Sequence, residues 1–377
     1  MDERDAIEET EIILDYLVVG HGLAGCLLAD ALGNQGVLVA VAGAKLPHAA
    51  SSVSAGILNP VIGPKLQPPW QASICLDAAQ RTYRRLERKH ESTFYDEMRI
   101  IRIFHSRDMA ELWDEKRKRE TDAEAETKEA FENGFFGPTL SPERLEREFS
   151  AEGRHGAGEI LGGGSLDVRG LLAASQKHLK ENKRFFRRPL RHGDLRRNGE
   201  YLQWDNLNVR KVIFCEGYRL KYNPWFSALP FAPTRGETLK LGPLPALACL
   251  NAGSWITPQA DGSSLAGSTY EHDDLEAGPT PEGEAEIRRR LSFLRELPEA
   301  SERLAGVRPS TTDRMPLIGS HPSEPGLVLF NGFGSRATLL APFCADLLAN
   351  HLVLGSPIPK EIDLNRFPAA ANLPGLE

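Results

Sequence analysis

The stretch Gly20-His21-Gly22-Leu23-Ala24-Gly25 decides the fold of this 377-residue chain. It follows a mostly apolar segment, residues 12–19, and opens a helical pattern over residues 23–32. The spacing G-x-G-x-x-G between a strand and a helix is typical of a dinucleotide site. Its first glycine permits a tight turn, its second lets the backbone approach a pyrophosphate, and its third lets the helix pack close to the strand. We therefore predict a dinucleotide site, in preference to a purely structural turn, at Gly20, Gly22, Leu23, Ala24 and Gly25.

The segment after this turn supplies a second strand. Asn34-Gln35-Gly36 ends the helix, and residues 37–41 predict a buried strand parallel to the first. An acidic residue usually follows such a strand and holds the ribose hydroxyls, but here the chain reads Val41-Ala42-Gly43. We expect the ribose to be held by backbone, water or another side chain, unless the strand ends at a different residue.

The composition favours a soluble enzyme with two cores. Hydrophobic residues make up 41% of the chain, and the formal net charge is −7. This charge gives no basic footprint for nucleic acid, and no apolar stretch reaches the roughly 20 residues that span a bilayer. Small anionic or zwitterionic substrates would therefore need local Arg or Lys. Because residues 1–11 are acidic and unlike an export signal, we expect a cytoplasmic location.

The cysteines and histidines indicate neither a disulfide framework nor a metal site. The five cysteines are scattered, odd in number and without a Cys-x-x-Cys pair, which favours reduced core thiols. The ten histidines show no spacing typical of a metal site or a catalytic triad.

The rest of the chain predicts two interleaved domains in an α/β fold. Helical patterns cover residues 72–90, 109–132 and 168–180, and the charged second one reads as a solvated face. Asp167 is placed to cap the third helix. Further strands are expected at residues 212–215, 237–241, 254–257, 264–266 and 327–330, and a last helix at residues 338–352. We expect a Rossmann-like domain from residues 1–75, 145–220 and 305–377, and an α+β substrate domain on an antiparallel sheet from residues 76–144 and 221–304.

Several later segments carry a family resemblance. They are Ser51-Ser52-Val53-Ser54-Ala55-Gly56-Ile57-Leu58-Asn59-Pro60, Val212-Ile213-Phe214-Cys215-Glu216-Gly217, and the block from Gly306-Val307-Arg308-Pro309 to Ile318-Gly319 with Gly332-Phe333-Gly334 and Leu339-Leu340-Ala341-Pro342. Together they resemble the D-amino acid oxidase and glycine oxidase family over nearly the whole chain. The resemblance implies a Rossmann-like FAD-binding domain and FAD as the cofactor. It adds these cofactor residues: Ser51, Ser52, Gly56, Ile57, Gly217, Gly332, Gly334, Ser335, Arg336, Ala337 and Thr338.

The glycine turn before the last helix suits a flavin. A helix that begins at residues 335–338 presents free N–H groups and the positive end of its dipole. Reduced flavin carries negative charge near N1 and the C2 carbonyl, which such a terminus would stabilise. Arg336 would add a formal positive charge there, unless it is an ordinary exposed loop arginine. Near Arg308 the chain offers Ser310, Thr311 and Thr312 but no thiol, so we expect FAD to be bound non-covalently.

The resemblance also implies a substrate and a reaction. Arg308 matches an arginine that forms a bidentate pair with a substrate carboxylate; the structural alternative is a pair with an internal acid. Trp255 and Tyr270 fall where similar enzymes place side chains over the flavin, although either could be a core aromatic. The implied reaction takes a hydride from the carbon beside an amine to flavin N5 and then hydrolyses the imine. It needs no proton-transfer catalyst, and oxygen or a quinone reoxidises the flavin.

Two other functions stay open. A glycine oxidase-like domain also occurs in the enzyme that modifies the side chain of the tRNA wobble uridine, although the acidic charge here argues against RNA. A flavin- or nucleotide-binding protein without turnover, or an NAD-linked enzyme, is the other alternative. If the protein is a flavoenzyme, its absorption spectrum after purification must show bands near those of oxidised flavin.

Overall fold

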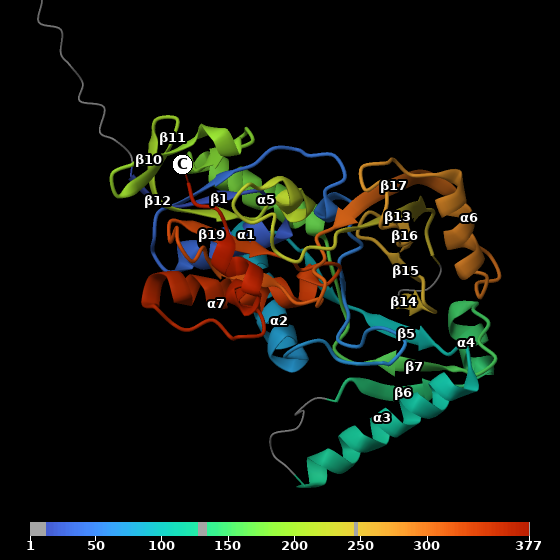
Figure 1. The fold of residues 1–377 in the computed structure, drawn as a ribbon. Coiled ribbons are helices and arrows are strands. Elements are labelled where there is room, and N and C mark those ends of the chain that lie inside the picture. The colour runs from blue at the N-terminus through green and yellow to red at the C-terminus, as the bar shows by residue number, and fades with distance from the viewer. Residues whose placement is uncertain (1–12, 127–133, 245–247, 377) are drawn as a thin grey trace, which may run out of the picture.

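The computed structural model describes residues 13–126, 134–244 and 248–376 (Figure 1). The expected α/β fold is confirmed, because a Rossmann-like sheet with helices lies beside a mostly antiparallel second sheet. The acidic segment 1–11 lies outside the described residues, as does the end of the predicted helix beyond residue 126.

The first sheet places the glycine turn at its centre. β1 (Ile13–Val19) lies between β2 (Val39–Ala42) and β12 (Leu207–Phe214), parallel to both. Beyond β2 follows β9 (Phe185–Phe186), and beyond β12 follow β19 (Leu327–Asn331) and the antiparallel β18 (Leu317–Ser320). β10 (Leu195–Asn198) and β11 (Tyr201–Trp204) extend the sheet at the other half of β12. The carboxyl ends of β1, β2, β12 and β19 therefore meet at one edge, where ligands bind in such sheets.

Helices cover this sheet. α1 (Leu23–Asn34) and α7 (Ala337–Leu354) pack together, and α2 (Ala72–His90) packs against α7 and α5 (Val168–Glu181). Asp167 caps α5 as predicted, because its side chain accepts from the N–H of Gly170. α7 is the helix of the described residues that is long and apolar enough to cross a membrane by composition, but half of it is buried, as in a core helix.

The second sheet has eight strands in the order β17, β13, β16, β15, β14, β5, β7 and β6. Neighbours are antiparallel except β14 and β5. The bounds are β17 (Ala300–Arg308), β13 (Thr234–Leu241), β16 (Ser264–Gly267), β15 (Trp255–Pro258), β14 (Ala248–Asn251), β5 (Arg99–Ile103), β7 (Ala157–Ile160) and β6 (Phe136–Leu140). A small third sheet joins β3 (Ile57–Leu58), β8 (Gly164–Leu166) and β4 (Tyr95–Glu97).

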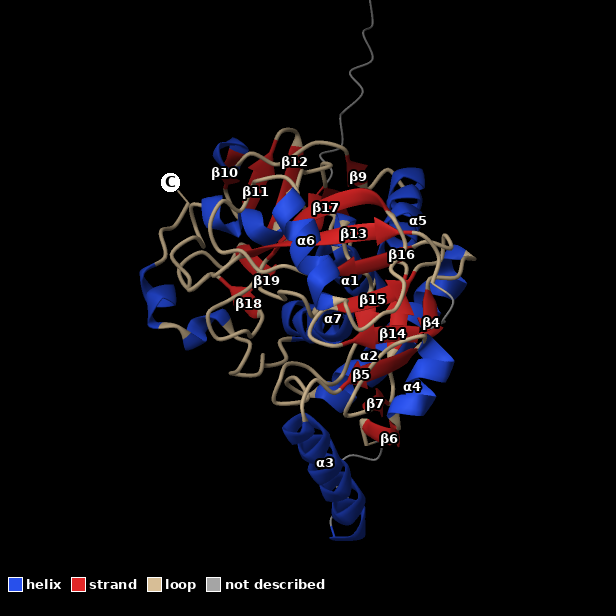
Figure 2. Ribbon diagram, turned by 90° about the vertical axis from the view of Figure 1, so that its right-hand side faces the viewer, coloured by secondary structure: helices blue, strands red, loops and turns tan. Residues whose placement is uncertain are grey.

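The two faces of the second sheet pack against different partners. Alternate residues of a strand point to opposite faces, and paired residues of neighbouring strands share a face. Ile101, Leu239 and Leu250 point to an outer face, whose core includes residues of α4 (Pro142–Phe149) and α6 (Pro281–Arg290). Ile100 and Cys249 point to an inner face, whose core includes α1 and α7. Figure 2 shows α6 beside β13.

The domain borders stay a prediction. Residues 157–160, assigned above to the first domain, form β7 and pair with β5 in the second sheet. α3 (Arg107–Glu126), charged as expected, lies along β6 and β7 (Figure 1). Sequence reasoning did not anticipate α6, whose N-cap is Thr280.

Candidate functional site

The first glycine turn is closed by backbone that leaves no room for side chains. Gly20 has a φ of +105°, and its N–H donates to the Ala42 carbonyl at 2.8 Å. A Cβ on Gly20 would lie 2.5 Å from the Cys215 carbonyl oxygen, and one on Gly25 would lie 2.0 Å from the Gly20 carbonyl oxygen. Both positions therefore require glycine, the first for its conformation and its space and the second for its space.

The N-terminus of α1 faces this turn. Gly22 is its N-cap and offers no side chain, and no acidic residue lies in the first turn. Ser51 reaches it from a distant loop, because its Oγ accepts from the Leu23 N–H at 3.0 Å. Ala24 follows in the same first turn. The other first-turn amides and the positive end of the helix dipole suit a phosphate.

The end of β2 explains the missing acidic residue. β2 ends at Ala42, so the strand has the expected register and Gly43 occupies the usual acidic position. A Cβ on Gly43 would lie 2.8 Å from the His21 Cβ and 3.2 Å from the Phe185 ring. β9 thus closes over this position, and burial lowers the pKa of His21 to about 4. No side chain larger than glycine fits without a shift, and a group elsewhere must hold the ribose.

The segment from Ser51 to Ile57 joins the two ends of the site. Ser51 contacts the start of α1, and the Ile57 carbonyl accepts from the Thr338 hydroxyl at 2.8 Å at the start of α7. Six residues of chain span at most about 20 Å, so the two helix ends are close enough for one extended dinucleotide. Gly56 has a φ of +69°, and a Cβ there would lie 1.8 Å from the Leu166 carbonyl oxygen. Ser52 is exposed, and its hydroxyl donates to the Ala49 carbonyl within its own turn.

The second glycine turn leads into α7. Gly332 and Gly334 have φ values of +83° and +57°, and no side chain caps the helix. Ser335 is exposed, and Ala337 is half-buried. Arg336, the N-cap, is half-buried and forms no ion pair among the described residues, and burial lowers its pKa. This end of the site therefore places a cation, unpaired among the described residues, beside the helix N-terminus, an arrangement that suits a group gaining negative charge.

Asn331 connects Gly217, just after β12, to the second glycine turn, and sequence reasoning missed it. Its side-chain amide donates to the Gly217 carbonyl at 3.0 Å, and its Oδ1 accepts from the Gly332 N–H at 2.8 Å. Gly217 has a φ of +59°, and a Cβ there would meet no atom within 4 Å. The signal in the sequence was an amide side chain at the end of a buried strand, directly before a glycine.

Arg308 ends β17 on the inner face of the second sheet. Its guanidinium lies over Gly236, where a Cβ would be 2.0 Å from Nη2. Nη2 donates to the Ser268 hydroxyl at 2.5 Å and to the Thr269 carbonyl at 3.2 Å, and Nη1 donates to the Arg235 carbonyl at 3.4 Å. Burial lowers its pKa, and it forms no ion pair with an acid among the described residues. Within the described part of the chain, the alternative of a pair with an internal acid is therefore not observed.

The two aromatic residues lie differently. Tyr270 is 57% exposed, and the Arg308 guanidinium carbon lies 4.3 Å from its ring centroid. Trp255 is half-buried on the inner face, and it pairs with Gly267 across the β15–β16 ladder. The structure thus brings Trp255 and Tyr270 to the part of the sheet that carries Arg308.

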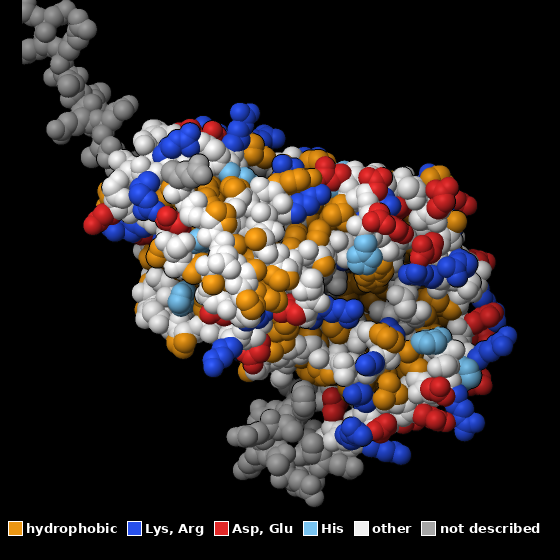
Figure 3. Space-filling view, in the orientation of Figure 1, with side chains coloured by type: hydrophobic (Ala, Val, Ile, Leu, Met, Phe, Trp, Pro, Cys, Tyr) orange, Lys and Arg blue, Asp and Glu red, His pale blue; other side chains and the backbone are white. Residues whose placement is uncertain are grey.

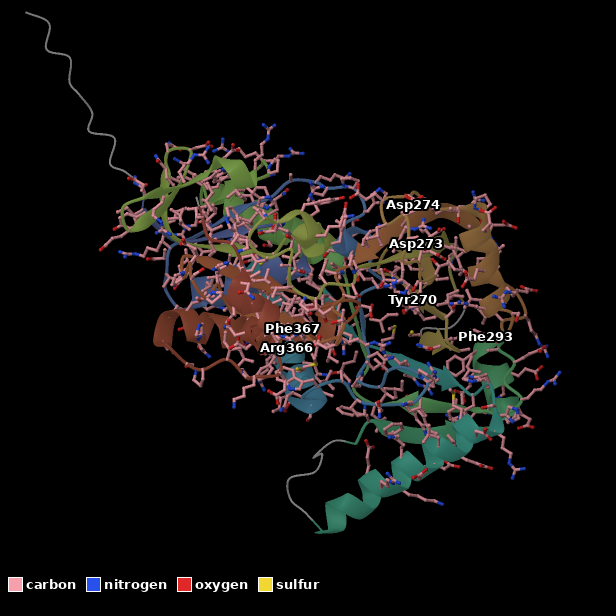
Figure 4. All side chains as sticks on the ribbon, in the orientation of Figure 1. Tyr270, Asp273, Asp274, Phe293, Arg366 and Phe367 are labelled. Atoms are coloured by element: carbon pink, nitrogen blue, oxygen red, sulfur yellow. The ribbon has the colours of Figure 1, made fainter. Side chains whose placement is uncertain are left out.

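The mouth of this region is acidic. The residues after Tyr270 include Glu271, Asp273 and Asp274, which are exposed and form no ion pair among the described residues (Figure 4). The space-filling view shows acidic side chains gathered over the part where β13, β17 and α6 lie, with a hollow in the surface below them (Figure 3).

Comparisons with known proteins identify the class. A family model described as FAD dependent oxidoreductase matches residues 15–351. The chain belongs to this family, and its cofactor is FAD. Its residues fit that cofactor, because two helix N-termini and Arg336, which has no ion pair among the described residues, lie along one path, and a Cβ on Gly20, Gly25, Gly56 or Gly332 would lie within 3.0 Å of another atom.

Part of the chain is similar in sequence to individual curated proteins. The chain is 28% identical over 180 residues to the tRNA 5-methylaminomethyl-2-thiouridine biosynthesis bifunctional protein MnmC of Aromatoleum aromaticum, covering 41% of this chain and 28% of that protein. It is 32% identical over 139 residues to glycine oxidase of Pseudomonas aeruginosa, covering 34% and 37%. The matched stretches span well under half of these curated relatives.

Solved structures share the fold over almost the whole chain. Iminodiacetate oxidase from Chelativorans sp. BNC1 has a TM-score of 0.72 at 22% identity, covering 92% of this chain and 97% of that one. Glycine oxidase from Geobacillus kaustophilus has a TM-score of 0.72 at 20% identity, covering 92% and 96%. The described residues contain no cluster of side chains that could hold a metal ion.

Proposed function

We propose that this FAD-dependent oxidoreductase oxidises a small amine or amino acid whose carboxylate pairs with Arg308. The observation that carries the proposal is a largely buried guanidinium that has neutral neighbours and no acidic partner among the described residues. A buried charge is retained without a partner at a considerable cost in stability, so an anionic ligand is the natural counterion.

The residues around Arg308 have orienting roles. Ser268, Thr269 and Gly236 hold the guanidinium against the inner face, so that its remaining donors suit the two oxygens of a carboxylate. Trp255 and Tyr270 flank the ligand and limit access by water. FAD, when bound, accepts the hydride from the carbon beside the nitrogen. The family relatives named glycine oxidase and iminodiacetate oxidase support an amine as the donor.

The test is anaerobic bleaching of the flavin absorption by glycine, sarcosine, proline and D-amino acids. In the Arg308→Ala variant, the affinity for carboxylate substrates should weaken by about 2–5 kcal/mol, as for a lost charge pair in a dry site. Arg303→Ala, on the same strand but in a partly exposed pair with Glu284, is the matched control and should leave affinity unchanged. If Arg308→Ala binds its substrate as tightly as the wild type, the proposal fails.

The reoxidant and the compartment belong to the same proposal. All five cysteines are free and buried, which suits a reducing cytoplasm. Oxygen or a quinone accepts the electrons, and stopped-flow reoxidation with each compound separates an oxidase from a dehydrogenase.

A second candidate is modification of a tRNA side chain, favoured by the sequence match to the tRNA biosynthesis proteins. The carboxylates of Glu271, Asp273 and Asp274 at the mouth argue against it, because they would repel a phosphate backbone. Bleaching of the flavin by undermodified tRNA, but by none of the free amines, would favour this function.

A further inference from the structure

The inner face of the second sheet carries another buried guanidinium besides that of Arg308. Arg102 lies on β5 and is 8% exposed. Among the described residues, the one hydrogen bond of its guanidinium runs from Nη1 to the Asn251 side-chain oxygen at 2.7 Å, and its Nε is buried without a partner. It has no ion pair and no aromatic contact there. Burial lowers its pKa, with no carboxylate near enough to oppose the shift.

The ladder pairings place Arg102 on the same face as the candidate substrate site. Arg102 pairs with Asn251, and Asn251 pairs with Trp255. Trp255 pairs in turn with Gly267, the neighbour of the Ser268 that binds Arg308. Because paired residues share a face, one row across the sheet joins Arg102 to Trp255 and to the neighbourhood of Arg308.

The spacing of the strands gives the length of a ligand that would reach both Arg308 and Arg102. Arg308 binds the residue after β16, and Arg102 binds β14, two strands away. Neighbouring strands lie about 4.8 Å apart, so the two points are about 10 Å apart across the sheet. A chain of several carbons with an anion at each end would reach both guanidiniums.

We infer that Arg102 forms a second anion subsite, and that the substrate is an amine or amino acid with a further anionic group at its far end. This inference rests on the proposed function, which places the first carboxylate at Arg308. It adds a specificity-determining residue from β5 and narrows the substrate to dianionic amines. The acidic rim, formed by Glu271, Asp273 and Asp274, is exposed and therefore screened by salt, whereas Arg102 acts in the interior.

The test uses ligands that the enzyme does not oxidise. The FAD-loaded protein is titrated by calorimetry with adipate, hexanoate and 6-aminohexanoate, which share a chain of six carbons. Adipate should bind at least 10-fold more tightly than hexanoate, and Arg102→Gln should remove this preference while changing hexanoate affinity less than 3-fold. Arg99→Gln is the matched control on the same strand, because Arg99 points to the outer face and pairs with Glu159. It should keep the adipate preference.

Thermal unfolding separates this role from a structural one. Because Arg102 is a buried charge without a counterion, Arg102→Gln should leave the melting temperature unchanged or raise it. A structural arginine would lower it.

The outcomes also distinguish the two proposals. If neither adipate nor hexanoate binds, the role of Arg308 in the proposed function fails. If both bind equally in the wild type, or if Arg102→Gln weakens both equally, the Arg102 subsite alone is overturned. Tighter binding of 6-aminohexanoate than of adipate would overturn it too, in favour of selection by the acidic rim.

Discussion

The two faces of the second sheet treat arginine in opposite ways. On the outer face, Arg235 pairs with Glu237 at 3.1 Å, and Arg99 forms two bonds with Glu159 at 2.8 and 3.0 Å. On the inner face, Arg308 and Arg102 are largely withdrawn from solvent, as Arg235 is, yet neither has an acidic partner among the described residues. One sheet thus holds paired and unpaired guanidiniums on its two sides.

This difference distinguishes arginines that stabilise the fold from arginines that are available to bind a ligand. A buried pair is a closed unit, because each charge satisfies the other and leaves nothing for a ligand. An unpaired buried guanidinium lowers stability until an anion arrives, so it is kept where binding is selected. We therefore propose the inner face as the binding side, and the apolar cluster on that face also includes residues of α1 and α7.

Breaking the outer pair should have the largest effect. Glu237 is 2% exposed and also accepts from the Thr280 N–H at 2.8 Å at the start of α6. Glu237→Ala would leave Arg235 buried and uncompensated, and we expect it to lower the free energy of unfolding by about 3–5 kcal/mol. Urea denaturation measures this loss. The control is Arg303→Ala, which breaks the partly exposed pair with Glu284 and should lower the free energy of unfolding by less than about 1 kcal/mol. Equal losses would remove the distinction between paired core and surface charges.

His21 can be compared with the buried arginines. A histidine avoids a buried charge by losing its proton, whereas an arginine stays charged. Burial lowers the pKa of His21 from an ordinary 6.5 to about 4, and Lys180 adds to the shift. Below pH 6.5 the unfolded chain binds a proton that the folded chain does not, so stability falls as pH falls, until both states are protonated below pH 4. The shift of about 2.5 pH units corresponds to about 3 kcal/mol.

The measurement is the unfolding free energy of the wild type and of His21→Gln between pH 7 and pH 4. The variant should lose the part of the slope that His21 contributes in this window. Parallel curves for the two proteins would show that His21 keeps an ordinary pKa.

The sequence predicts local features better than partnerships. The turn from Gly20 to Gly25 is set by backbone conformation and close approach over six residues, so its letters suffice. Arg308 came from a motif, but its lack of an acidic partner depends on β13 and on Ser268, 40 residues away. The family, the FAD cofactor and the α/β fold were predicted correctly for the same reason, because they follow from local motifs in order.

Arg102 and Gly43 show which features of the site could not be predicted from the sequence. Arg102 stands in a strand that sequence reasoning did not single out, and its one partner, Asn251, is 149 residues away. The lack of an acid at Gly43 was visible in the sequence, but the crowding of that position by His21 and by the Phe185 ring of β9 needed the sheet order. Side-chain pairing across a sheet is decided by register, which no single segment contains.

The smallest expected effect moves an unpaired arginine without removing its charge. In Gly236→Ala, the new Cβ would lie 2.0 Å from the Arg308 Nη2, so the guanidinium must shift while the backbone of β13 tolerates alanine. We expect carboxylate affinity to fall by about 1–2 kcal/mol, since position rather than charge is lost. Gly278→Ala, where no atom lies within 4 Å of the new Cβ, is the control for adding a methyl group nearby. Titration with hexanoate measures both, and an unchanged affinity in Gly236→Ala would mean that Arg308 binds carboxylate from a position other than the one held against Gly236.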